Sequence, residues 1–181
     1  VIPAGWYYDV QLGTTMITAA DDLYLKIKSY NISVDGDKLR RAFDFGMRSH
    51  DGQMRASGEP YFSHPIAVAN ILADMRLDLD TVITALLHDT VEDTSVTPTD
   101  ITREFGPKIA KLVVELTDVS KPEDGNRKTR KAIDRDKLAG VSAEAQTVKY
   151  ADLISNGKDI AQNDPKFAKV YHACLLYTSD A

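Results

Sequence analysis

The residues most capable of chemistry lie in the run from His88 to Asp93, where an adjacent His-Asp pair is followed one helical turn later by an adjacent Glu-Asp pair. Apolar residues from Val82 to Leu87 precede the run at a spacing that predicts a buried helix. This helix would deliver four polar groups where its apolar face ends. An unpaired buried charge costs on the order of several kcal/mol, so such groups are usually paired or bound to metal. The run therefore predicts one half of a metal-dependent hydrolytic site.

The other half must come from elsewhere in the chain, and the candidates are His64 and Asp152, with Asn156 one helical turn after Asp152. Together with the His-Asp pair they supply two imidazoles and several carboxylates, without sulfur. Such a nitrogen and oxygen set suits Mn²⁺, Fe²⁺ or Zn²⁺. A divalent ion lowers the pKa of bound water and polarises a phosphoryl oxygen, while adjacent carboxylates orient the water and move protons. The residues thus indicate phosphoester hydrolysis.

The elements that position these side chains are predicted to be helices. Apolar periodicity and start signals predict helices over residues 17–30, 37–50, from 63, 78–87, 97–106, 107–117, 142–161 and from 165. Asp37 is the expected N-cap of the second helix. Residues 51–63 contain two glycines and a proline, which predict a loop with room for a small β-hairpin. No repeat or β-period run competes, so the predicted fold class is all-α, a single-domain helical bundle.

The composition of the chain argues against several classes of function. The chain has 181 residues, of which 43% are hydrophobic and 27% charged, as expected for one globular domain. Its net charge of −5 argues against a general nucleic-acid or anionic-membrane surface. The single cysteine, Cys174, cannot form an internal disulfide, and no apolar run approaches the roughly 20 residues that span a bilayer. The N-terminus also lacks a secretory signal, so we expect a cytoplasmic protein.

The two ends differ from the middle. Residues 1–15 show no periodicity, and residues 177–181 follow a helical pattern abruptly. We therefore expect an N-terminal extension over 1–15, a folded domain over 16–176 and a tail over 177–181.

The candidate residues also carry a family resemblance. His64, His88-Asp89 and Asp152 resemble the H…HD…D signature of the HD phosphohydrolase superfamily. The segment from Gly52 to Tyr61, the His-Pro pair that follows it and the run Leu87–Thr94 are similar to the hydrolase domain of Rel/Spo-type guanosine polyphosphate (alarmone) enzymes. The resemblance runs from about residue 39 to 159 and is densest between 50 and 106. Because no synthetase sequence follows, the chain resembles the stand-alone small alarmone hydrolases.

The resemblance implies an HD-type helical bundle that removes the 3′-pyrophosphate from (p)ppGpp with one Mn²⁺. The implied metal ligands are His64, His88, Asp89 and Asp152. Glu92 and Asp93 would activate the water, Arg55 would contact the guanine, and Asn156 would contact the nucleotide. The expected partner is a small guanine nucleotide, with neither nucleic acid nor membrane as a partner and the oligomeric state left open. An arginine plane can stack on a base, which agrees with the role implied for Arg55.

Two departures from the family pattern leave alternatives open. Ala56 stands where the family usually has a basic residue, and Leu153 stands where it has an arginine. An HD phosphohydrolase acting on another 2′- or 3′-phosphorylated nucleotide is therefore the second hypothesis. The basic stretch 127–137 is either a source of cations for a polyphosphate or a solvated helix face. A third hypothesis, a catalytically silent nucleotide-sensing domain, predicts loss of ligands, yet the implied ligands are all present.

Overall fold

The computed structural model describes the backbone of residues 10–171 and the side chains of residues 18–171. Within this part of the chain the regular elements are helices, which confirms the predicted all-α class. They are α1 (Val10–Lys28), α2 (Gly36–Ser49), α3 (Ser63–Asp74), α4 (Leu79–Leu87), α5 (Thr90–Asp93), α6 (Pro98–Phe105), α7 (Pro107–Leu116), the 3-10 helix η1 (Pro122–Asp124), α8 (Arg127–Ala139) and α9 (Ala143–Asn163). Residues 165–171 are also helical.

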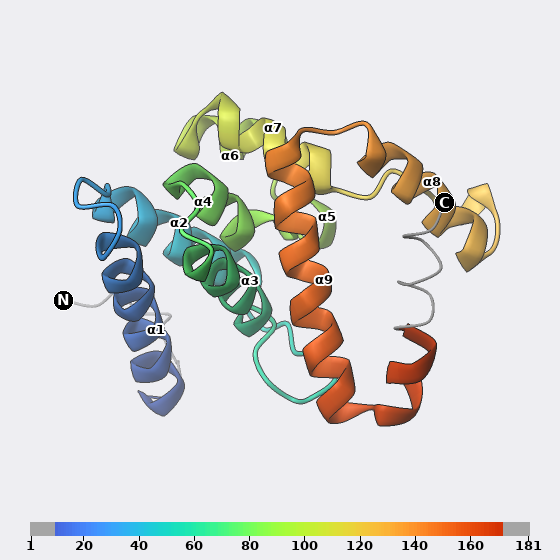
Figure 1. Ribbon diagram of the computed structural model, residues 1–181, viewed down its shortest axis with the longest axis horizontal. Helices are drawn as coiled ribbons and strands as arrows, with labels where there is room; N and C mark the ends of the chain where they lie inside the picture. Colours follow the sequence, from blue (N-terminus) through green and yellow to red (C-terminus); the bar gives the residue numbers. More distant parts are fainter. Residues whose placement is uncertain (1–9, 172–181) are drawn as a thin grey trace.

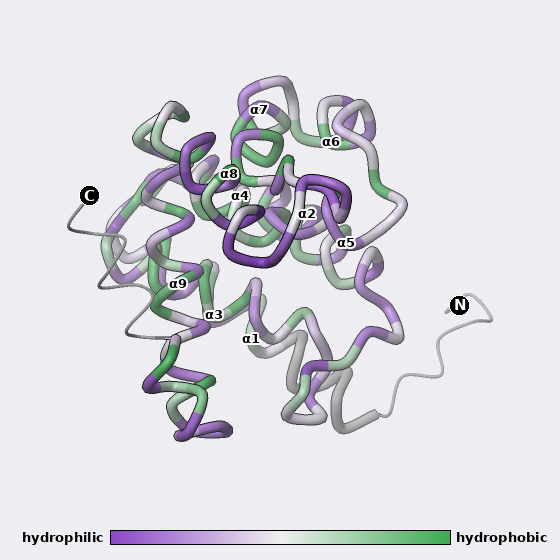
Figure 2. The backbone as a smooth tube through the Cα atoms, turned by 90° about the vertical axis from the view of Figure 1, so that its right-hand side faces the viewer, coloured by the Kyte–Doolittle hydropathy of each residue, from purple (hydrophilic) through white to green (hydrophobic). Residues whose placement is uncertain are grey.

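The bundle is organised around α4, in which all residues from Thr81 to Leu87 are buried. Helices α2, α3, α7 and α9 pack against it, and α1 covers α3 from the other side. Figure 1 shows α9, in orange, running beside α3, so two segments distant in sequence form one wall. In Figure 2 hydrophobic and hydrophilic residues alternate along most helices, as expected for amphipathic helices around one core. None of the helices in the described segment is long and apolar enough to cross a membrane.

Several helix starts follow from local capping. The side chain of Asp78 accepts the N–H groups of Asp80 and Thr81 at the start of α4, and Thr97 forms a capping box at the start of α6. The prediction of Asp37 as N-cap of α2 was wrong. Asp35 has the extended backbone of a cap and accepts the N–H of Lys38, so α2 begins earlier and Asp37 lies in its first turn.

The loop predicted over 51–63 ends at residue 62, because Ser63 begins α3, and this loop 51–62 folds back on itself. Met54 and Pro60 form an isolated antiparallel bridge, and the N–H of Arg55 donates to the carbonyl of Glu59 at 2.8 Å. Gly58 turns the chain with φ +87°, a conformation that glycine adopts at little cost. The small hairpin is thus reduced to one bridge, and no strand is assigned within residues 10–171.

The expected domain limits lie partly outside residues 10–171. The tail 177–181, Cys174 and residues 1–9 of the expected extension lie outside the described part of the chain. Helix α1 begins at Val10, earlier than the predicted start at residue 17.

Candidate metal centre and its surroundings

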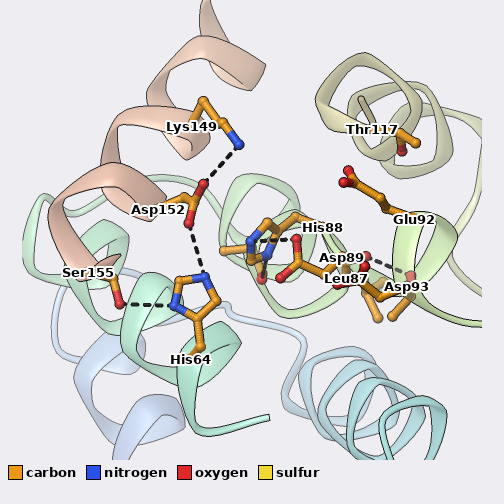
Figure 3. Close-up of polar contacts among 12 residues, drawn as sticks. His64, Leu87, His88, Asp89, Glu92, Asp93, Thr117, Lys149, Asp152 and Ser155 are labelled. Atoms are coloured by element: carbon orange, nitrogen blue, oxygen red, sulfur yellow. Dashed lines mark hydrogen bonds and ion pairs between the residues drawn. The ribbon is translucent and has the colours of Figure 1, made fainter. Parts of the chain in front are cut away.

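Three separate elements bring the candidate ligands together. His64 is the second residue of α3, His88 and Asp89 form the link between α4 and α5, and Asp152 lies in α9. Because α3 packs on both α4 and α9, these residues meet although they span 64 to 152 in the sequence. Figure 3 shows the two imidazoles with Asp152 above His64 and Asp89 beside His88.

Distances define a compact group. One ligand atom each from His64, His88 and Asp89 lies within 4.8 Å of the others. Nε2 of His64 is 3.0 Å from Oδ1 of Asp152, and Nε2 of His88 is 3.1 Å from Oδ1 of Asp89. Asp152 is outside the mutual group of three and joins it through His64. Two nitrogens and two carboxylates therefore lie close together.

The orientation of the imidazoles suits a divalent ion. Nδ1 of His88 is 2.8 Å from the carbonyl of Ala85, which can only accept, so Nδ1 is the donor and Nε2 is the nitrogen left to bind a cation through its lone pair in the neutral ring. This Nε2 is buried and has no hydrogen-bond partner among the described residues, because its contact with Asp89 lacks hydrogen-bond geometry. Nδ1 of His64 is held by Oγ of Ser155 at 3.1 Å. Outer partners that fix the ring and leave Nε2 facing carboxylates are typical of metal-binding histidines.

Asp152 is held as a carboxylate by its neighbours. The Lys149 ammonium lies 2.9 Å from Oδ2, and the Asn156 amide donates to Oδ1 at 2.6 Å. Burial raises the pKa of Asp152, but the hydrogen bond from His64 and the charge of Lys149 outweigh burial and hold the pKa well below its usual range. Burial alone would lower the pKa of Lys149, yet the charge of Asp152 raises it. The pair is therefore ionised, with the carboxylate turned toward the imidazole.

The two carboxylates after the His-Asp pair are exposed and diverge. Glu92 accepts the N–H of Asp118 at 3.0 Å, and in Figure 3 its carboxylate lies on the Thr117 side of the cluster. Partial desolvation and the negative charges of Asp118 and Asp89 raise the pKa of Glu92, against the opposing effect of that N–H. Asp93 instead accepts the hydroxyl of Tyr61 at 3.0 Å. The helix is interrupted between α4 and α5, so the four polar groups do not follow from one continuous helix, contrary to the expectation.

Arg55 lies at the far end of the same wall. Its guanidinium is 2.9 Å from Oδ2 of Asp159, two turns after Asp152 in α9, and the side chain is only 13% exposed. This ion pair attaches the loop 51–62 to the helix that carries Asp152 and Asn156. Leu153 is half-buried and Ala56 is exposed, so neither contributes a charge to this surface.

The basic stretch forms α8, and two of its cations, Lys131 and Lys137, contact groups outside α8. Lys131 pairs with Asp118 at 2.8 Å, and Lys137 donates to the carbonyls of Val114 and Thr117 at the end of α7. These contacts anchor α8 to the α7 end. A role of the remaining cations in binding phosphate stays a prediction.

Two of the residues that contact the candidate ligands, Ser155 and Tyr61, were not predicted to do so from the sequence. Ser155 holds His64, and Tyr61 donates to Asp89 at 2.7 Å as well as contacting Asp93. Tyr61 ends the motif-bearing loop, so its place in that motif was the available signal. For Ser155 the signal was its position three residues after Asp152, on the same helical face.

Comparison with known proteins agrees with this geometry. The HD domain family profile matches residues 42–168. The GTP pyrophosphokinase rsh of Brucella ovis is 42% identical over 138 residues, which are 75% of this chain and 18% of that protein. The bifunctional (p)ppGpp synthase/hydrolase SpoT of Escherichia coli is 44% identical over 95 residues, 52% of this chain and 14% of that protein. The chain thus spans less than a fifth of the length of these relatives.

A further curated relative is the guanosine-3′,5′-bis(diphosphate) 3′-pyrophosphohydrolase of Vibrio cholerae, 46% identical over 96 residues, 53% of this chain and 14% of that protein. Among solved structures, a metazoan ortholog of SpoT that hydrolyses ppGpp superposes with a TM-score of 0.63 at 31% identity, covering 70% of this chain and 72% of that chain. The chain therefore belongs to the HD domain family and is homologous to the hydrolase domains of SpoT- and Rel-type proteins.

Proposed function

We propose that this chain hydrolyses (p)ppGpp, releasing pyrophosphate from the 3′ position, with Mn²⁺ as its cofactor. The convergence of His64, His88 and Asp89 within 4.8 Å, with Asp152 against His64, is the observation that carries the proposal. A ppGpp-type hydrolase is also supported by the names of the relatives. The guanine nucleotide is accordingly the proposed partner.

The proposed ligands of the divalent ion are His64, His88, Asp89 and Asp152. The buried, unpartnered Nε2 of His88 supports this set, since a buried nitrogen without a hydrogen bond is rare unless it binds something. When bound there, the ion would polarise a phosphoryl oxygen and lower the pKa of water.

The chain's own residues would move protons and orient the nucleotide. Glu92 has a raised pKa, which brings it closer to neutral pH and suits it to accept a proton from the attacking water. Asp93 would orient that water from the position fixed by Tyr61. Arg55 would stack its plane on the guanine, and Asn156, whose Nδ2 donates to Asp152, would present its other amide atom to the nucleotide.

The test measures pyrophosphate and GDP released from ppGpp by the Mn²⁺-replete protein. We expect Asp89→Ala to abolish release, because it removes one member of the three-residue group. Asp136→Asn is the matched control, since Asp136 is an exposed carboxylate on α8 with a side chain 77% exposed. Unchanged activity in Asp89→Ala would refute the metal-site assignment.

A second candidate keeps the chemistry and changes the substrate. The absence of charge at Ala56 and Leu153 favours an HD phosphohydrolase acting on another 2′- or 3′-phosphorylated nucleotide. A panel of such nucleotides separates the two candidates, because release from another member but not from ppGpp would transfer the assignment. Binding of ppGpp without turnover of any nucleotide would instead indicate the silent sensing domain.

A further inference from the structure

We propose that Tyr61 is a positioning residue that sets the orientation of Asp89 and its spacing from Asp93, and thereby the affinity of the site for its cation. The inference rests on the proposed function, since it concerns the same metal centre. Tyr61 contacts both carboxylates without being a proposed metal ligand itself.

The phenol hydroxyl of Tyr61 lies between the two carboxylates. Its oxygen is 2.7 Å from Oδ2 of Asp89 and 3.0 Å from Oδ2 of Asp93. Ionised carboxylate oxygens only accept hydrogen bonds, so the phenol O–H of Tyr61 is the donor in both contacts. A single proton thus serves two like charges that would otherwise repel each other, and it fixes how closely they approach.

The same contact decides which oxygen of Asp89 faces the imidazoles. Oδ2 is occupied by Tyr61, whereas Oδ1 is turned to Nε2 of His88 at 3.1 Å. Hydrogen bonds to a ligating carboxylate orient it and tune its affinity for the metal. Without the hydroxyl, Oδ2 of Asp89 would lose the partner that fixes the orientation of the carboxylate.

The ring of Tyr61 is held independently of its hydroxyl. It packs against the buried imidazole of His50 with centroids 4.8 Å apart and an interplanar angle of 31°. Nδ1 of His50 is 2.9 Å from Oε1 of Gln53, whose amide donates to the backbone carbonyl of Asp93 at 3.1 Å. The backbone N–H of Tyr61 donates to the carbonyl of Gln53 at 2.9 Å. This network keeps the ring in place, so removing the hydroxyl alone is a clean perturbation.

A purely structural role makes a different prediction. If the hydroxyl only fastened the loop 51–62 to α5, its removal would lower the melting temperature of the metal-free protein and leave metal affinity unchanged. A positioning role predicts weaker metal binding and a lower kcat at saturating metal, with the KM for ppGpp unchanged.

The experiment compares Tyr61→Phe with wild type by titrating Mn²⁺ into chelator-treated protein in a calorimeter. We expect the dissociation constant to rise roughly 10- to 100-fold, the range typical for loss of an outer-shell partner. Tyr30→Phe is the matched control, because the Tyr30 hydroxyl also donates a long-range hydrogen bond, to the carbonyl of Leu77 at 3.0 Å, away from the metal centre. Its Mn²⁺ affinity should equal that of wild type.

Three results would overturn the inference, and they can be told apart. If wild type binds Mn²⁺ and Tyr61→Phe binds it equally well, the positioning role is refuted and the proposed function stands. If wild type binds no Mn²⁺ and releases no pyrophosphate, the proposed function fails and the inference fails with it. A fall in melting temperature of Tyr61→Phe with unchanged affinity overturns the inference in favour of a structural role.

Discussion

Gly46 allows α2 to approach α4 closely near the end of α4, directly before His88. A Cβ at this position would lie 2.5 Å from Cε2 of Phe62 and 2.7 Å from the backbone carbonyl oxygen of Leu86. Phe62 cannot simply swing away, since its ring packs edge-on against Phe43 with centroids 5.2 Å apart. The Leu86 carbonyl belongs to α4 itself. Gly46→Ala must therefore push the two helices apart.

The informative result is whether Gly46→Ala raises or lowers the stability of the protein. Replacing a helical glycine with alanine in open space stabilises by about 0.5–1 kcal/mol, whereas overpacking a core costs about 1–3 kcal/mol. Because one clashing atom is backbone, we expect the upper part of that range and a net loss of about 2 kcal/mol, or a melting temperature lower by roughly 4–8 °C.

Thermal melts followed by circular dichroism on chelator-treated protein would measure this difference. Gly140→Ala is the matched control, because the nearest atom to its added Cβ is 3.6 Å away and its φ of −98° suits alanine. It should melt at or slightly above the wild-type temperature. If Gly46→Ala melts as high as Gly140→Ala, the close packing of α2 on α4 is refuted.

Three further predictions concern polar contacts. Burial raises the pKa of Asp134, but hydrogen bonds from the residues at 119 and 120 outweigh burial and lower it, so this stabilisation is present at neutral pH and lost as pH falls. Urea denaturation should show that Asp134→Asn lowers the free energy of unfolding by about 1.5–3 kcal/mol at pH 7. The difference from wild type should narrow as pH falls below about 4. A difference that does not change with pH would contradict the reasoning. Ser155→Ala removes the partner of Nδ1 of His64 and should weaken Mn²⁺ binding about tenfold or more in a chelator competition, and unchanged affinity would show that the ring needs no outer partner. Asp159→Asn weakens the ion pair that holds Arg55, so steady-state kinetics should show a higher KM for ppGpp with little change in kcat, and the reverse pattern would assign Asp159 to the chemistry.

The helical class and most helix starts could be predicted because their signals are local. Pro98 and Pro107 stand in the first turn of α6 and α7, as expected, and Ser63 begins α3. The cap of α2 could not be chosen from sequence, because Asp35 and Asp37 are equally good caps and the backbone at Asp35 alone is extended there.

The residues of the site also divide into those that the sequence predicts and those that only tertiary packing reveals. His64, His88, Asp89 and Asp152 were expected to share a cation because their types suit a metal and because they resemble the HD signature; the fold groups the first three and places Asp152 against His64. The contacts of Tyr61 and Ser155 depend on loop and helix packing across 28 and 91 residues, which no local periodicity encodes. The Glu-Asp pair diverges because its members are neighbours in α5, and Glu92 contacts Asp118 while Asp93 contacts Tyr61, two tertiary contacts that local spacing does not encode.

Helix α9 supplies Asp152, Ser155 and Asp159 at spacings that place them along one face. Asp152 and Ser155 contact His64 of α3, and Asp159 contacts Arg55 of the loop 51–62. One helix therefore contacts the site both at a candidate metal ligand and at the proposed guanine contact. Undocking of α9 as an intact helix would separate all three contacts at once. Docking of α9 therefore forms these three contacts together. A cation or nucleotide that bridges α9 and α3 would shift this docking equilibrium, and amide hydrogen exchange across the α3–α9 contact would slow in proportion to its occupancy.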